Sequence, residues 1–476
     1  MSLIARPPCD AAGVASGRGD GADCAERSRP WALAATVLGS SMAFIDGSAL
    51  TVALPALRSS LGADLAGLQW VIGAYVLALA AFTLIGGALA DRYGRRLVFA
   101  TGCAVFAAAS LACALAPTLG SLVAARFAQG VGAALLTPSS LALISSIYPR
   151  ERRGAAIGIW AAASAITAAA GPVLGGWLTQ TFGWQAIFFL NLPLAVGAIV
   201  LALRHAPVAR VPGAVNRPAD WIGAVLAAAA LGALAWGLVL LGEQRDASVP
   251  AWAVWVALGT GALLIGGFAL RERAARAPMM PLRFFESREF TGLNLATLLL
   301  YAALSTLFFL LPFELIETRG FDATEAGLAL LPFTLAVGLL SRSFGALADR
   351  IGARLPIAAG AGIAALGYAW MAGFGEAHGF AVGMLPGLAA LGLGFALLVA
   401  PLTAAVLAAV ADDDEGTASG INNTASRIAQ LVGAAGAAAI ATASDEPLPL
   451  ALWLCTGASA VAALVIWQTV SSNDRA

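Results

Sequence analysis

Charged residues are scarce in this chain: Asp, Glu, Lys and Arg make up 11% of the 476 residues, whereas hydrophobic residues make up 60%. Soluble domains carry charge at roughly a quarter of their positions. The scarcity of charge therefore excludes an ordinary soluble domain, and most side chains must face lipid or other apolar helices. Because unpaired backbone groups are costly in hydrocarbon, we expect the long apolar segments to cross it as helices rather than strands.

Further shortages exclude other classes of protein. All 27 basic residues are Arg and the formal net charge is zero, so no nucleic-acid partner is indicated. The 5 cysteines are scattered and predict neither a disulfide framework nor a metal cluster. The 2 histidines, His205 and His378, fall in predicted loops, and the apolar runs contain no Ser/His, Cys/His or clustered carboxylate arrangement. We therefore expect no catalytic residue, no metal site and no cofactor.

What the chain does contain is a series of apolar runs, each long enough to cross about 30 Å of hydrocarbon. They predict an all-α integral membrane fold with about fourteen transmembrane helices, in groups of six, two and six. The predicted helices cover residues 31–55, 68–90, 97–116, 119–144, 155–178 and 184–203, then 221–241 and 251–270, then 290–312, 326–347, 355–374, 380–405, 418–442 and 448–470. Pro386 and Pro401 are expected to kink the twelfth helix.

The placement of Arg predicts the orientation, because basic residues are retained on the cytoplasmic side. Arg clusters follow predicted helices two, four and eight, so both termini are expected in the cytoplasm. The protein itself is expected in the cytoplasmic membrane. No apolar stretch precedes Trp31, unlike a cleaved secretory signal. The predicted domains are a disordered cytoplasmic tail (1–30), a six-helix bundle (31–203), two linking helices with cytoplasmic loops (204–289), a second six-helix bundle (290–470) and a short cytoplasmic tail (471–476).

One internal repeat is the most specific signal in the chain. Residues 87–97, GALADRYGRRL, recur at 345–355 as GALADRIGARL. Both copies join the second and third helices of a six-helix group, so the halves are parallel repeats, as in transporters that rock two bundles around a central site. Helices seven and eight stand outside this repeat, as an inserted pair.

The repeated loop resembles the signature of the major facilitator superfamily, and the whole pattern resembles its fourteen-helix drug:proton antiporter family from about Trp31 to Val470. Glycines permit a tight turn at the membrane surface, and an Asp among arginines can pair in one conformation and separate in another. We therefore interpret the loops as a conformational latch, with cytoplasmic anchoring alone as the alternative. The predicted latch residues are Gly87, Asp91, Arg92, Gly94, Arg96, Asp349, Arg350 and Gly352.

Asp46 is an acidic residue well inside an apolar run. Because a charge at bilayer depth is costly, its presence there suggests a functional role. At 1.5 Å per residue, Asp46 and Arg126 lie at similar heights, about 20 Å from the cytoplasmic face. Arg126, Gln129 and Gly130 belong to a segment that resembles the superfamily motif associated with proton coupling. A neighbouring Arg favours the charged carboxylate, whereas separation and burial favour the protonated one. We expect the pair to couple proton binding to conformation, with a static buried pair as the alternative.

The fifth predicted helix carries small residues at a spacing of four, among them Gly171 and Gly175, followed by Gly176. Such a face lets another helix approach closely, and Pro172 permits a bend. The segment resembles the superfamily motif regarded as characteristic of exporters, which predicts a hinge-like packing face. Close packing without a hinge role is the alternative.

Polar residues of the thirteenth helix are candidates for the transport pathway. Asn423 and Arg427 lie four apart on one face and can form one polar patch toward the bundle interior, with ordinary interhelical hydrogen bonding as an equal alternative. Asn422 is also a pathway candidate. Gln129 is a further pathway candidate. Glu314, near the outer end of the ninth helix, is either a second functional carboxylate or a solvated charge.

The resemblance implies a secondary active transporter that exports small amphipathic drugs or antibiotics in exchange for protons, by alternating access. Its expected partners are a small-molecule substrate, protons and the lipid bilayer; its energy source is the proton gradient, and it is expected to be a monomer. The alternatives are export of an endogenous metabolite or self-made antibiotic, proton-coupled uptake, and a membrane sensor that does not transport.

Overall fold

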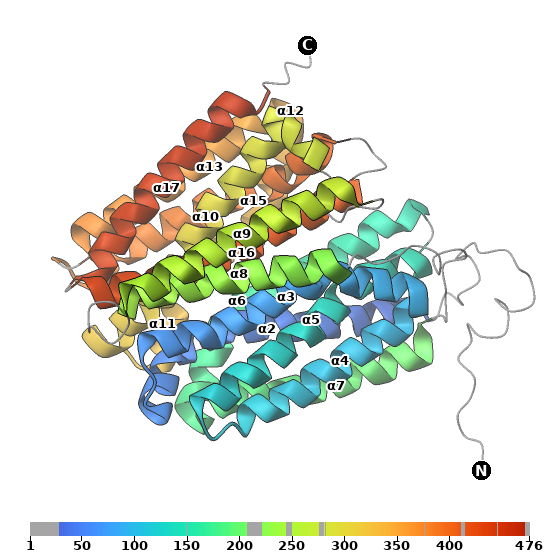
Figure 1. The fold of residues 1–476 in the computed structure, drawn as a ribbon, viewed down its shortest axis with the longest axis horizontal. Helices are drawn as coiled ribbons and strands as arrows, with labels where there is room; N and C mark the ends of the chain where they lie inside the picture. The colour runs from blue at the N-terminus through green and yellow to red at the C-terminus, as the bar shows by residue number, and fades with distance from the viewer. Residues whose placement is uncertain are drawn as a thin grey trace, which may run out of the picture.

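The computed structural model describes residues 28–148, 150–206, 221–243, 250–275, 280, 282–375, 377–410, 415–444 and 446–471. Secondary structure over these ranges is helical (Figure 1), as the all-α prediction requires. Nearly all of both predicted tails lies outside the described residues. Eleven described helices are long and apolar enough to cross a membrane by length and composition. Three further long helices, Arg150–Phe182, Trp221–Glu243 and Glu415–Ala443, are not among these eleven, so the count of fourteen spans stays a prediction.

The first six helices form one packed group. Their bounds are α2 Arg29–Leu61, α3 Leu65–Tyr93, α4 Arg95–Ala114, α5 Leu119–Ile147, α6 Arg150–Phe182 and α7 Gln185–His205. Short turns between them are set by local caps: Asp64 accepts a hydrogen bond from the Gly67 amide at the start of α3, and Thr118 and Ser121 form a capping box on α5. Within the group, α5 packs between α3 and α4, while α2 packs against α6 and α7.

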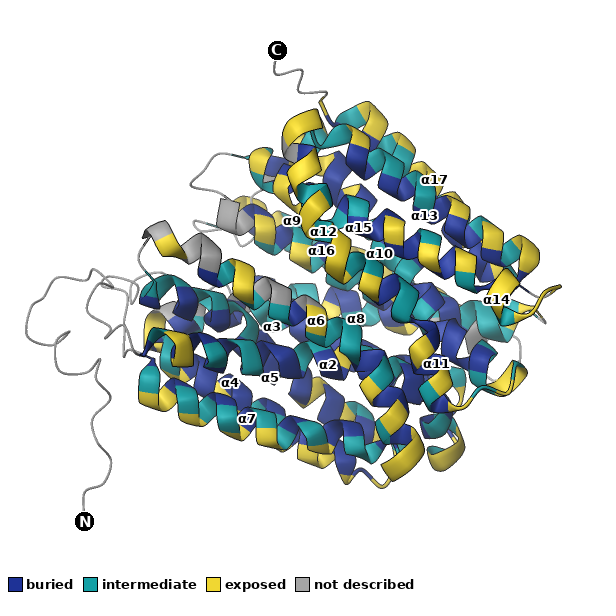
Figure 2. Ribbon diagram, turned by 180° about the vertical axis from the view of Figure 1, so that it is seen from behind, coloured by how far each residue is buried: buried dark blue, intermediate teal, exposed yellow. Residues whose placement is uncertain are grey.

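Two helices follow that have no counterpart in the repeat. They are α8 Trp221–Glu243 and α9 Ala251–Ala274, which pack against each other as an antiparallel pair. Helix α8 contacts α3 of the first group and α16 of the last group, so it bridges the two. Helix α9 is the outer member, with Trp255 70% and Leu263 79% exposed. Large apolar side chains at that exposure are expected to face lipid. Exposed residues also lie along the outward sides of other helices (Figure 2).

The last group repeats the six-helix pattern with two interruptions. Its bounds are η4 Leu282–Glu286, α10 Arg288–Phe313, η5 Glu314–Thr318, α11 Ala323–Ala329, α12 Leu331–Ile351, α13 Arg354–Phe374, α14 Phe380–Gly383, α15 Leu385–Ala408, α16 Glu415–Ala443 and α17 Pro447–Thr469. The predicted twelfth helix breaks at Met384, where Pro386 occupies the first turn of α15. Pro401 lies inside α15, which continues past it.

The two groups touch along two seams. Helix α16 packs against α3, and α11 and α12 pack against α6. The α6–α11 contact lies at the end of the bundle that the predicted orientation places outside the cell, where α2 also meets α10. Between the seams lies the cavity described below.

Candidate functional site

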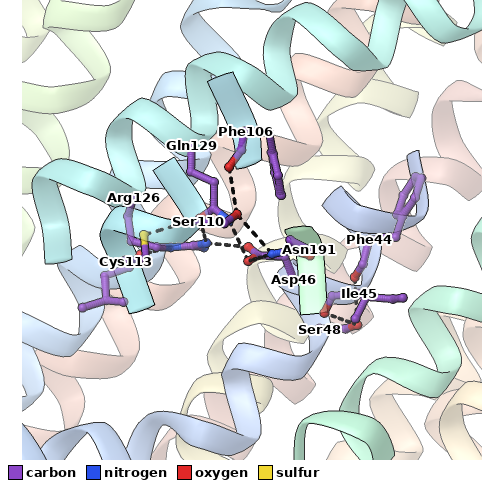
Figure 3. A network of polar contacts seen from close by, with 11 residues as sticks. Phe44, Ile45, Asp46, Ser48, Phe106, Ser110, Cys113, Arg126, Gln129 and Asn191 are labelled. Carbon is purple, nitrogen blue, oxygen red and sulfur yellow. Dashed lines mark hydrogen bonds and ion pairs between the residues drawn. The ribbon is translucent and has the colours of Figure 1, made fainter. Parts of the chain in front are cut away.

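A buried ion pair lies in the first helix group. Arg126 of α5 forms a hydrogen-bonded salt bridge with the Asp46 carboxylate of α2 (Figure 3). The Asp46 side chain is fully buried and that of Arg126 is 1% exposed. The structure therefore brings together the two residues that depth along their helices placed at the same height. A buried pair is held only when further hydrogen bonds satisfy both ions, because desolvating two charges is expensive.

Those further bonds come from two amide side chains, one on α5 and one on α7, which also contact a serine of α4. The Gln129 amide nitrogen donates to Asp46 Oδ1 at 2.8 Å and to Ser110 Oγ at 2.9 Å. The Asn191 amide nitrogen of α7 donates to the same Oδ1 at 3.2 Å and lies 3.3 Å from Ser110 Oγ of α4. The Gln129 amide oxygen accepts a bond from Arg126. Asp46 thus accepts hydrogen bonds from side chains of α5 and α7, and all of these groups belong to one buried polar network (Figure 3).

Helix α3 supplies further contacts of Arg126. Its Nε donates to the Val71 carbonyl oxygen at 3.0 Å, and its guanidinium carbon lies 4.4 Å from the centre of the Tyr75 ring. Gly130 makes this approach possible, because a Cβ there would lie 2.4 Å from the Tyr75 carbonyl oxygen. The close packing of α3 on α5 therefore orients Arg126 with a backbone carbonyl and an aromatic face.

Two members of this network were not among the predicted site residues. Asn191 interrupts the apolar run of α7, and an isolated amide at that depth is a signal that sequence reasoning could have used. Ser110 gives no comparable signal, because serine satisfies itself within a helix, as Ser110 does with the Phe106 carbonyl oxygen at 2.8 Å.

A cavity of about 510 Å³ lies between the two six-helix groups. Its size is within the range of sites for drug-sized ligands. Helices α2, α3, α5 and α6 line one side, and α10, α12 and α16 line the other. Arg126 is on its wall, whereas the buried Asp46 lies behind Arg126 rather than among the lining residues. The ion pair is thus next to the cavity, and Arg126 lies between the cavity and Asp46.

The polar candidates on α16 divide between two environments. Asn423 and Arg427 line the cavity, and Arg427 donates to the Gln430 side chain at 3.3 Å. Asn422 faces α10 instead, where its amide nitrogen lies 2.8 Å from Thr297 Oγ1 and 3.3 Å from Asn294 Oδ1. The structure therefore places Asn423 and Arg427 along the cavity and Asn422 at a helix interface.

Glu314 is not among the residues that line this cavity, and it lies at the start of the π-helical turn η5. It forms an ion pair with Arg319 at 2.9 Å, and both side chains are largely buried. It also lines a second, smaller cavity of about 160 Å³, together with Arg58 and Glu317. Arg58 and Glu317 pair at 2.8 Å across the two helix groups. Glu314 thus belongs to an outer cluster of charges and is separate from Asp46.

The glycines of α6 allow it to lie against α2. A Cβ on Gly171 would lie 1.8 Å from Ser48 Oγ, and one on Gly175 would lie 2.5 Å from the Ala49 carbonyl oxygen. Both glycines are therefore required for the observed helix separation, in the way that small residues permit close packing in membranes.

The neighbouring residues of α6 contact the other half of the molecule. A Cβ on Gly176 would lie 2.1 Å from the Ala323 carbonyl oxygen of α11. In return, a Cβ on Gly327 would lie 2.3 Å from the Pro172 carbonyl oxygen. These backbone contacts close the bundle at the end where α11 lies, so Gly176 and Pro172 are part of an interface between the two helix groups.

The two copies of the repeated loop have the same turn geometry. Gly94 and Gly352 have φ angles of 103° and 84°, which L side chains rarely adopt. Their amides donate to the Ala90 and Ala348 carbonyl oxygens at 3.0 and 2.9 Å. A glycine is therefore needed at this position in each copy.

The charged residues of these loops are described in part. Arg96 donates to the Ala206 carbonyl oxygen at 3.1 Å, at the end of α7. The Arg92 guanidinium lies 5.4 Å from the Tyr93 ring centre, and Arg350 is exposed. Gly87 faces Pro138 of α5 across 3.9 Å, measured from a Cβ built on it. The side chains of Asp91 and Asp349 lie outside what the structure describes.

Comparison with known proteins identifies the class that this fold and cavity define. A family model described as Major Facilitator Superfamily matches residues 36–283 and 293–475, so the chain belongs to this superfamily. This confirms the family resemblance and the fold class. The chain is a multi-pass membrane protein that transports small molecules, which is the activity of a transporter rather than of an enzyme.

Relatives of this chain carry names from drug and antibiotic resistance. It is 37% identical over 403 residues to the multidrug resistance protein Stp of Mycobacterium tuberculosis (strain CDC 1551 / Oshkosh), covering 84% of this chain and 74% of that protein. It is 33% identical over 417 residues to the tetracenomycin C resistance and export protein of Streptomyces glaucescens, covering 86% and 75%. It is 36% identical over 408 residues to the cephamycin export protein of Amycolatopsis lactamdurans, covering 84% and 82%.

Among solved structures, the chain is similar to the peptide transporter POT in complex with sulfate. The TM-score is 0.67 at 15% sequence identity, over 92% of this chain and 93% of the other. At this identity the likeness concerns the fold alone.

Proposed function

We propose that this protein exports small amphipathic drugs or antibiotics in exchange for protons, by alternating access. The observation that carries the proposal is the buried Asp46–Arg126 pair, whose arginine lies on the wall of a drug-sized cavity between two repeated helix groups. The export direction is supported by relatives named as resistance and export proteins. We further infer a monomer in the cytoplasmic membrane, with both termini in the cytoplasm and the proton gradient, rather than a cofactor, as energy source.

At the ion pair, a proton and Arg126 compete for the Asp46 carboxylate, so proton binding can be coupled to a conformational change. With Asp46 charged, its carboxylate holds Arg126 and two amides from α5 and α7, which ties three helices together. A proton on Asp46 removes the charge that holds Arg126, and Arg126 then turns toward the cavity that it already lines. Because α2 also packs against α6, this release can reach the outer contacts of α6 with α11.

The contacts at the outer ends indicate which state the structure represents. Gly176 and Gly327 leave no room for even a methyl group between α6 and α11, and Arg58 pairs with Glu317 nearby. We infer a conformation closed on the outside, with the cavity accessible from the cytoplasm. The two repeated loops, with their glycine turns, are proposed as the latch that closes the cytoplasmic side in the opposite state.

The experiment that tests coupling is transport in proteoliposomes with an imposed pH gradient, using a panel of fluorescent dyes and antibiotics. Asp46→Asn is expected to abolish accumulation driven by the pH gradient while retaining substrate counterflow, since the amide keeps the shape but cannot bind a proton. Asp64→Asn is the matched control, because Asp64 is an exposed helix cap and Asn caps equally well. Gradient-driven transport by Asp46→Asn equal to that of the unmodified protein would remove Asp46 from the mechanism.

A second candidate is export of one antibiotic or metabolite made by the same cell. The names of the tetracenomycin C and cephamycin relatives favour it, because each specifies a single antibiotic. The same panel separates the candidates: a multidrug exporter moves many unrelated compounds, whereas a dedicated exporter moves one chemical family.

A further inference from the structure

The charge of the central cavity is unequal between its two sides. On the first side, the charge of Arg126 is offset by Asp46 directly behind it. On the other side, Arg427 of α16 faces the cavity, and its hydrogen-bond partner within the described chain is the neutral side chain of Gln430. None of the described lining residues is acidic. The cavity therefore carries about one uncompensated positive charge between apolar walls of low dielectric constant, which concentrate its field.

The rest of the lining supplies flat apolar surface and neutral donors. Tyr301, Phe308 and Phe333 line the side that holds Arg427, and Phe44 lines the opposite side. Aromatic faces can also attract cations, but the Tyr75 ring is already covered by the Arg126 guanidinium at 4.4 Å. An additional cation in this cavity would have to approach Arg427 without a carboxylate to offset the repulsion. An aromatic anion meets no such penalty.

We propose that the cavity selects aromatic substrates that carry a negative charge, with Arg427 binding the acid group and the aromatic side chains packing on the ring. Arg is suited to this role because its planar guanidinium presents paired donors to carboxylate or sulfonate oxygens. Asn423, one turn before Arg427 on the same face, offers a neutral amide to the same group. This proposal rests on the proposed export function, because it assigns the substrate class of that same cavity.

The test uses two probes that share a ring and differ in fixed charge, naphthalenesulfonate and naphthyltrimethylammonium. Their binding to the full-length protein in detergent is measured by equilibrium dialysis, and their transport is measured in proteoliposomes. The unmodified protein is expected to bind the sulfonate more tightly than the ammonium compound. Arg427→Gln is expected to weaken sulfonate binding about tenfold to a hundredfold, as for a hydrogen bond to a charged group.

Two further variants make the result specific. Arg427→Lys retains the charge and is expected to keep a preference for the anion, although binding is weaker without the fork of donors. Arg288→Gln removes the same charge at an exposed position at the start of α10, outside the cavity, and is expected to leave both affinities unchanged. Because the comparison of the two probes on the unmodified protein needs no substitution, an unstable variant does not prevent a decision.

The outcomes separate this proposal from the export function. Tighter binding of the ammonium compound, or sulfonate binding that Arg427→Gln leaves unchanged, overturns the substrate assignment even if proton-driven export is observed. Sulfonate binding that depends on Arg427, without proton-driven transport of any probe, supports the assignment and overturns the proposed function.

Discussion

The two helix groups repeat each other in fold but differ in the chemistry at their centres. In the first group, the middle of α2 holds Asp46 in an ionic network. At a comparable distance along α10, Ser305 and Thr306 instead donate to the Gln430 and Gly433 carbonyl oxygens at 2.8 and 3.0 Å. Duplicated helices therefore keep their packing while one copy carries the buried charges. The comparison places a buried ion pair at the centre of the first group, whereas the centre of the second group is neutral apart from the cavity arginine.

The largest expected difference between the two groups is in stability after the central polar side chain is removed. Asp46→Leu leaves Arg126 buried without its counter-ion, and it is expected to lower the free energy of unfolding by about 3–5 kcal/mol. Ser305→Ala in the second group removes a neutral hydrogen bond and is expected to cost about 1 kcal/mol. Unfolding in mixed micelles, followed by circular dichroism, measures both.

A double variant identifies the cause of the loss. Asp46→Leu combined with Arg126→Leu removes both charges and is expected to recover part of the stability that the single variant loses. If Asp46→Leu were as stable as Ser305→Ala, the charge in the first group would contribute nothing special and the comparison would fail.

An intermediate effect is expected from two asparagines, one in each group. Asn191 donates to the Asp46 carboxylate, so Asn191→Leu is expected to cost about 1.5–3 kcal/mol, the range for hydrogen bonds to charged groups. Asn422 bonds to neutral partners on α10, so Asn422→Leu is expected to cost about 0.5–1.5 kcal/mol. The same unfolding assay ranks them. In transport, Asn191→Leu should alter the dependence on the pH gradient and Asn422→Leu should not; equal effects of the two would contradict the division of roles.

Much of this arrangement could be predicted from the sequence because a bilayer restricts the backbone to few choices. The apolar runs located the helices within a few residues, and the repeat located two turns whose glycines have the same φ region. The common height of Asp46 and Arg126 followed from the fixed rise of a helix. These are properties of single helices or of short loops.

The remaining features depend on how each helix is rotated and on its neighbours, which the sequence does not specify. Asn422 and Asn423 are adjacent, so their directions differ by about 100°, and packing sends one toward α10 and the other toward the cavity. Asn191 joins the ionic network only because α7 packs against both α2 and α4. The π-helical turn Glu314–Thr318 follows the end of α10 and was not among the predicted elements.

The smallest expected effect concerns the link between the two groups at their outer ends. Arg58 and Glu317 pair at 2.8 Å, but their side chains are 41% and 42% exposed, so solvent and salt screen the attraction. A double-mutant cycle with Arg58→Gln and Glu317→Gln is expected to give a coupling energy of about 0.2–1 kcal/mol at low salt, falling as salt is raised. A coupling energy above about 2 kcal/mol that is insensitive to salt would mean that the groups are joined by a strong outer bond. In that case backbone packing between α6 and α11 would not be the main closure, and the division between a charged first group and a neutral second group would have to include this shared pair.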